Sequence, residues 1–126
     1  MMLMGCTPGK EATEKQAMEK QIKNQVDEVV AALDSGKKAE DFKSLSKKGI
    51  EDLFIVDPDG TFLVHPEFLG QNLKTYRASY NAIVQATTEG VWVEYIHHYR
   101  RKHSYVKKTK DGLIVGSGYF VLRPNE

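Results

Sequence analysis

Apolar residues recur at steps of three and four positions early in the chain. This spacing is typical of one face of an amphipathic helix, and it predicts a long helix over positions 8–35. Thr7 followed by Pro8 suits the start of such a helix, and Gly36 suits its end. The helix should be about 40 Å long, and its polar first half, up to Ala17, is expected to project from the domain. The apolar stripe consists of Met18, Ile22, Val26, Val29, Val30 and Leu33.

Beyond position 50 the pattern changes from helical spacing to strand-like runs rich in β-branched and aromatic residues. Two of the junctions, Asp57-Pro58-Asp59-Gly60 and Asp111-Gly112, are turn sequences that join antiparallel strands. Short helices are expected over Lys38–Lys48 and Ser79–Thr88. These elements predict an α+β fold in which the long N-terminal helix packs on a five-stranded antiparallel sheet within positions 50–122. The expected strands cover positions 52–56, 61–65, 91–98, 103–108 and 113–121.

The second strand is expected to end at His65, because Pro66 cannot donate a hydrogen bond to a neighbouring strand. The segment Pro66–Arg77 follows it. At about 12 residues it is long for a connection in a small domain, and long connections often carry binding residues. We therefore expect a functional site to begin where this strand stops.

The chain has 126 residues, which fits one compact domain. Its formal net charge of +1 favours no class of partner, and we expect neither a nucleic acid nor a cofactor to bind. No apolar run reaches the length of a membrane span. Cys6 is the single cysteine, so an internal disulfide cannot form.

Cys6 follows Leu3-Met4-Gly5, and the four residues look like a bacterial lipobox, in which the cysteine is lipidated. A signal peptide needs an apolar segment of roughly seven or more residues before the cleavage site, and only positions 1–5 precede Cys6. Two interpretations follow. Either the sequence begins within a longer precursor, or Cys6 is an ordinary cysteine in an N-terminal tail over positions 1–7.

Five sequence runs, in order, resemble the single Cache domain, the extracytoplasmic small-molecule sensor of bacterial chemoreceptors and sensor kinases. They are FIVDPDGTFLVHP, LGQNL, GVWVEY, KHSYVK and GLIVGSGY, and the similarity extends from Leu53 to Val121. The resemblance implies a PAS-like fold with a long N-terminal helix across one face of the sheet. It also implies a small ligand, often a carboxylate, between the other face and the loop after the second strand.

In chemoreceptors, two membrane helices bracket this domain and lead to an output module. This sequence contains neither, so the resemblance favours a free-standing, non-catalytic sensor in signal transduction or chemotaxis. Its expected location is the periplasm or the outer cell surface, with a lipid anchor on Cys6 as one possibility. A membrane-bound receptor or kinase would be its protein partner. A homodimer through the exposed side of the long helix is a further expectation.

The cationic candidates for holding a carboxylate are Arg77 and Lys102. Arginine offers a planar fork of donors that grips a carboxylate at two points, and Lys102 begins the run that matches the family motif. The alternative is that both are solvated surface cations, as most lysines and arginines are. His65 matches the histidine–proline pair of the family, and its ring could donate to a ligand oxygen. Otherwise it is a histidine at a strand end that is tied to a loop carbonyl.

Aromatic residues with a polar atom are typical of pocket walls. Alternation along a strand places Trp92 and Tyr95 on opposite faces of the sheet, so both cannot line one pocket. We expect Tyr95 and Tyr105 to line it, Trp92 to pack in the core unless it contributes a wall, and Tyr119 to be a weaker candidate.

Metal binding is not expected, because adjacent histidines such as His97 and His98 point to opposite faces of a strand. Asp57 and Asp59 are explained by turn formation rather than by calcium. Two other classes of function remain open. One is a small enzyme that uses His65 or Glu94 as its acid–base group, although no second catalytic group is recognisable. The other is a structural or interaction module with no ligand, which a pocket too small for a ligand would favour.

Overall fold

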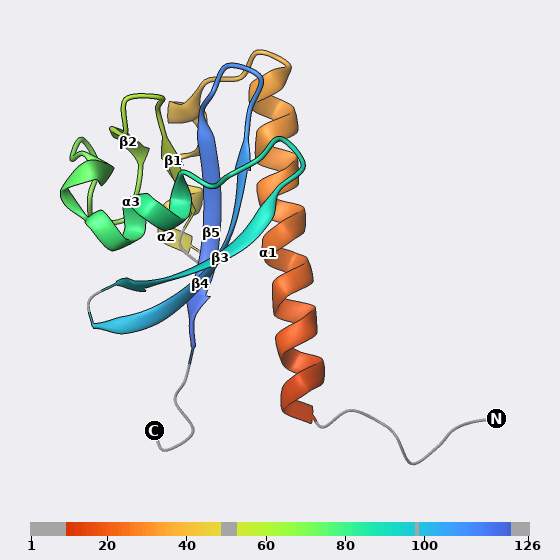
Figure 1. The fold of residues 1–126 in the computed structure, drawn as a ribbon. Coiled ribbons are helices and arrows are strands. Elements are labelled where there is room, and N and C mark those ends of the chain that lie inside the picture. Colours follow the sequence, from red (N-terminus) through yellow and green to blue (C-terminus); the bar gives the residue numbers. More distant parts are fainter. Residues whose placement is uncertain (1–9, 49–52, 98, 122–126) are drawn as a thin grey trace.

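The computed structural model describes residues 10–48, 53–97 and 99–121 (Figure 1). Its strands form a single sheet in which all paired neighbours are antiparallel. The predicted α+β architecture, a long helix on a five-stranded antiparallel sheet, is therefore confirmed. The elements are α1 (Lys10–Asp34), η1 (Ala39–Phe42), α2 (Leu45–Lys48), β1 (Phe54–Val56), β2 (Phe62–Val64), η2 (Leu73–Thr75), α3 (Arg77–Ile83), β3 (Val91–His97), β4 (Arg100–Lys108) and β5 (Ile114–Phe120).

Several boundaries differ from those that the sequence predicts. The helix expected over Lys38–Lys48 is divided into the 3-10 turn η1 and the short helix α2. The helix expected over Ser79–Thr88 begins and ends earlier, and Thr87 instead accepts a backbone hydrogen bond from Lys108 on β4, at 2.8 Å. Strand β4 begins before His103, because Arg100 and Arg101 pair with residues of β3. Pairing across the sheet overrides the weak strand preference of these basic residues.

Helix α1 covers one face of the sheet and lies on the right of it in Figure 1. The apolar stripe of the helix is buried from Ile22 to Leu33, whereas residues 13–17 are exposed, as expected for a projecting first half. Each buried valine or isoleucine contributes roughly 1.5–3 kcal/mol to folding. This packing makes one of two hydrophobic cores. The sheet supplies Ile55, Val64, Tyr105 and Val115 to it, and Leu53 joins them from just before β1.

The turn between β1 and β2 is stabilised by its own side chains. The carboxylate of Asp57 accepts hydrogen bonds from the backbone N–H groups of Asp59 and Thr61, both at 2.9 Å. Gly60 has φ +93°, a value that a residue with a side chain rarely adopts. Asp57 therefore acts as a turn residue, as the sequence predicts.

The strand order is β2-β1-β5-β4-β3, so β2 and β3 are the two edges of the sheet. The chain between them, which contains η2 and α3, must therefore cross a whole face, and it crosses the face opposite α1 (Figure 1). This crossing segment buries the second core. Its buried members are Phe54, Val56, Phe62, Leu73, Ala82, Ile83, Ala86, Val93, Tyr95, Val106 and Ile114.

Candidate ligand-binding site

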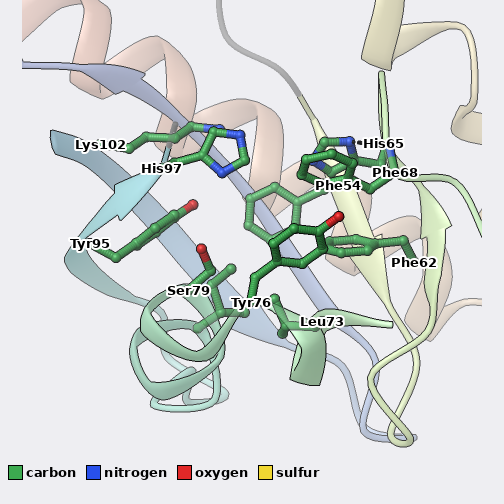
Figure 2. Close-up of a pocket in the computed structure, with 11 residues that line it drawn as sticks. Phe54, Phe62, His65, Phe68, Leu73, Tyr76, Ser79, Tyr95, His97 and Lys102 are labelled. Atoms are coloured by element: carbon green, nitrogen blue, oxygen red, sulfur yellow. Dashed lines mark hydrogen bonds between the residues drawn. The ribbon is translucent and has the colours of Figure 1, made fainter. Parts of the chain in front are cut away.

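A small cavity lies beneath the crossing segment, between β3, β4 and the loop after β2 (Figure 2). Its volume is about 10 Å³, which is room for about one water molecule. The walls are mainly aromatic, with hydroxyl, imidazole and ammonium groups among them. The lining residues are Phe54, Phe62, His65, Phe68, Leu73, Tyr76, Ser79, Ile83, Tyr95, His97 and Lys102.

Lys102 brings a positive charge to this cavity from β4. Its residue is only 4% exposed, and its Nζ atom lies 5.8 Å from the ring centre of Phe54 and 5.7 Å from that of Phe120. Aromatic faces attract a cation at such distances. Among the described residues that line the cavity, Lys102 is the only lysine or arginine, and none is an aspartate or glutamate. The walls therefore favour an anion.

His65 holds the loop to the end of β2. Its Nδ1 atom accepts backbone hydrogen bonds from Glu67 and Phe68, both at 2.9 Å. In the neutral ring the proton must then be on Nε2, which is a donor. His65 is therefore tied to the loop through two backbone N–H groups rather than through the expected carbonyl. Its ring also forms part of the cavity wall.

Three flat rings are stacked along the loop side of the cavity (Figure 2). The ring centre of Phe68 lies 4.6 Å from that of His65 and 4.7 Å from that of Tyr76, with interplanar angles of 17° and 14°. His97 meets Phe68 edge-on at 5.5 Å. The sequence pattern does not identify Phe68 and Tyr76 as wall residues, and it suggests His97 only as a metal ligand. Their positions depend on how the loop folds back.

Tyr95 supplies a hydroxyl from β3. It lies 3.0 Å from the Ser104 hydroxyl on the neighbouring strand. Burial raises the pKa of Tyr95 to about 12, so the hydroxyl stays protonated at neutral pH. Register explains why Tyr95 and Lys102 share the cavity, since they are direct partners across β3 and β4.

A larger outer groove adjoins the cavity and has a volume of about 230 Å³. The cavity and the outer groove share four lining residues, namely Phe68, Tyr76, Ser79 and His97. These side chains therefore separate the enclosed space from the open one. Arg77 lines the outer groove, where it is exposed, and does not line the cavity.

The structure thus brings His65, Tyr95 and Lys102 together, and it places Trp92, Tyr105 and Tyr119 elsewhere. These three pack on the opposite face of the sheet, in the core beneath α1. The expectation that Tyr105 lines the pocket is wrong, and strand alternation explains why. Lys102 and Tyr105 are three positions apart on β4, so their side chains point to opposite faces. Trp92 has the core position that alternation favours.

Polar contacts join this opposite face to α1. The hydroxyl of Tyr105 donates to Asp27 at 3.2 Å, and the ammonium of Lys107 donates to the same carboxylate at 3.0 Å. The hydroxyl of Tyr119 donates to Glu19. Burial, together with the hydrogen bond and negative charge of Glu19, raises the pKa of the Tyr119 hydroxyl. Tyr105 and Tyr119 therefore anchor the helix.

Among the described residues, no group of three or more histidine, cysteine, aspartate or glutamate side chains is placed to hold a metal ion. Within the same ranges, no helix is both long enough and apolar enough to cross a membrane. Cys6 and His98 lie outside the described residues.

Comparison with solved structures finds a crystal structure of a methyl-accepting chemotaxis protein from Vibrio parahaemolyticus with a similar fold. The TM-score is 0.58 at 15% sequence identity, and the alignment covers 86% of this chain and 92% of that chain. No protein-family model matches the sequence, and no curated protein matches it. At this identity the similarity shows a shared fold.

Proposed function

We propose that this chain is a non-catalytic, small-molecule-binding sensor module of the single Cache type, and that it binds a small organic acid in the cavity beneath the loop. The observation that carries the proposal is the buried ammonium of Lys102 among aromatic walls. A positive charge attracts an anion more strongly in a buried site than in water, and none of the described lining residues is acidic. A ligand carboxylate would therefore be held near the Lys102 ammonium. The fold of a chemotaxis protein supports a role in signal transduction.

Binding requires the cavity to enlarge, since its present volume is about 10 Å³. Phe68 and Tyr76 separate it from the outer groove. An outward rotation of these side chains would join the two spaces, and their combined volume would approach the roughly 300 Å³ at the lower end of the range for small-ligand pockets. The ligand would then shift the population from a closed to an open state, which requires a higher affinity for the open one.

Strand β4 offers a route from the cavity to α1. Lys102 faces the cavity, and the next residue, His103, faces the helix, with its Nε2 atom 3.6 Å from a carboxylate oxygen of Glu19. A ligand that moves Lys102 would also move this contact. We therefore propose that the position of α1 depends on whether the cavity is occupied. A membrane-bound receptor or kinase would bind α1 in one of its two positions.

An extracytoplasmic location is also part of the proposal, and the lipobox-like run at Cys6 supports it. Mass spectrometry of the protein purified from membranes tests this point. We expect lipid mass on Cys6. An unmodified Cys6 in a protein made from the full-length gene would contradict the anchor without affecting ligand binding.

A second candidate function is a structural or interaction module that binds no ligand. The small cavity volume favours it, because about 10 Å³ cannot hold even a two-carbon acid. The two candidates make opposite predictions for ligand-dependent stability.

Thermal unfolding in the presence of small carboxylates separates them. A ligand at 100 times its Kd stabilises the folded state by about 2.7 kcal/mol, which should raise the Tm by roughly 10 °C in a domain of this size. We expect at least one acid to do so, and Lys102→Met to abolish the shift. Lys110→Met is the matched control, because Lys110 is exposed on the turn between β4 and β5. No shift with any acid would support the ligand-free module instead.

A further inference from the structure

Phe68 occupies a slot whose walls are themselves aromatic. The rings of His65 and Tyr76 cover its two faces at 4.6 and 4.7 Å, nearly parallel to it. His97 and Phe62 approach from the sides, at 5.5 and 6.0 Å between ring centres. Figure 2 shows His65, Phe68, Tyr76 and Phe62 on the loop side of the cavity, and His97 beside Lys102. The slot therefore has the shape and the contacts of a site for one flat ring.

The side chain of Phe68 can leave this slot without loss of the hydrogen bonds that hold the loop. Those bonds are made by the backbone: the N–H of Phe68 donates to Nδ1 of His65, and its carbonyl accepts from the N–H of Gln71 at 2.8 Å. Phe68 is also only partly buried and lines the outer groove. The groove gives the displaced ring a place to go.

The charged groups around the slot determine which charged groups the ligand can have. The polar groups on the sheet side are Lys102, His97 and the neutral hydroxyl of Tyr95. Lys102 and His97 both approach the same ring, that of Phe120. No described residue lining the cavity is acidic. A ligand ammonium would therefore be buried there without a counter-charge. A second carboxylate would lie among phenylalanine rings.

We propose that the cavity selects a planar aromatic monocarboxylate. Its ring takes the place of Phe68 between His65 and Tyr76, and its carboxylate faces Lys102 and His97. This inference rests on the proposed function, because it requires the cavity to be the ligand site. It goes further because it specifies that the ligand has an aromatic ring and a single negative charge. It also specifies that the Phe68 side chain competes with the ligand ring for the slot.

Calorimetric titration of the purified wild-type protein tests the charge pattern with four probes. Benzoate and terephthalate differ by one carboxylate, benzoate and benzylamine differ by the sign of the charge, and butyrate is a monocarboxylate without a ring. We expect benzoate to bind most tightly. Terephthalate and benzylamine should bind at least about 100-fold more weakly, because each buries a charge without a partner. Butyrate should bind about 10-fold more weakly, because it lacks the ring.

The same titration with Phe68→Ala tests whether the Phe68 ring competes with the ligand for the slot. Removal of the ring that must be displaced should tighten benzoate binding by about 10-fold, since the open slot is then the populated state. Leu69→Ala is the control and should leave the affinity unchanged, because Leu69 is 53% exposed and does not line the cavity. If the alanine variant does not fold, Phe68→Leu replaces it, with a smaller gain of a few-fold.

The outcomes separate the inference from the function on which it rests. Tighter binding of butyrate or terephthalate than of benzoate overturns the inference and leaves the sensor function standing. Weaker benzoate binding by the Phe68 variant also overturns it. So does equal binding of benzoate and benzyl alcohol by that variant, since the gain would then come from the new cavity alone. Binding of no carboxylate at all by the wild type overturns the proposed function as well.

Discussion

Gly116 on β5 lies directly under a ring that forms the cavity wall. It is the register partner of Phe54 on β1. A Cβ atom at position 116 would lie 2.2 Å from the Cζ atom of Phe54, whereas ordinary contact begins at about 3.4 Å. The substitution Gly116→Ala must therefore move the Phe54 ring by about an ångström or more. The ring is 2% exposed, so it can move only towards the small cavity.

The expected cost follows from this geometry. Overpacking of a core by one methyl group costs about 1–3 kcal/mol. The change from glycine to alanine inside a strand recovers roughly 0.5–1 kcal/mol. We therefore expect Gly116→Ala to lower the free energy of unfolding by about 1–2 kcal/mol. The displaced ring should also reduce ligand affinity, because Phe54 contacts the cavity from the side of Lys102.

Urea denaturation of the wild type, the two single variants and the double variant measures this effect. Phe54→Leu removes the ring atoms that the new methyl group would meet, so Gly116→Ala should cost less than about 0.5 kcal/mol in that background. The coupling energy should be about 1 kcal/mol or more. Additivity within about 0.5 kcal/mol would show that the alanine methyl group does not meet Phe54, and would refute the packing described here.

Two further predictions concern contacts away from the cavity. Burial alone would raise the pKa of Asp27, but hydrogen bonds from Lys23 and Lys107 outweigh it and lower the pKa. The stabilising contribution of the Asp27 carboxylate is therefore complete above its ordinary pKa of about 3.9. That contribution is lost as the pH falls through the lowered pKa of the folded state. Asp27→Asn should lose about 1 kcal/mol less stability than the wild type between pH 5 and pH 3 in urea titrations, and equal losses would contradict this assignment. Asp57→Ala removes an acceptor for two backbone N–H groups and should lower the unfolding free energy by about 1–2 kcal/mol; no change in the urea midpoint would show that the turn does not need this carboxylate.

The features that the sequence predicts well depend on local periodicity. The helical stripe ending at Leu33 defines the helix and its buried face, and the turn at Gly60 defines the first hairpin. Alternation correctly separates Trp92 from Tyr95. The same rule, applied to β4, would also have separated Lys102 from Tyr105, so that error was avoidable from the sequence alone.

The remaining features depend on contacts between distant segments, which periodicity does not encode. Phe68 and Tyr76 lie in a loop with no regular spacing, and they become wall residues only because the chain must cross from one sheet edge to the other. Arg77 has the chemistry of a carboxylate ligand, but the start of α3 places it in the outer groove. The chemistry of these side chains is visible in the sequence, and their positions are not.

A crystal structure of the protein with a bound small carboxylate, benzoate first, tests the central claim most directly. We predict a carboxylate oxygen at about 2.8 Å from Nζ of Lys102, with the Phe68 ring moved from between His65 and Tyr76 into the outer groove. An acid bound only at Arg77 in the groove, with the cavity still closed over Lys102, would contradict the account.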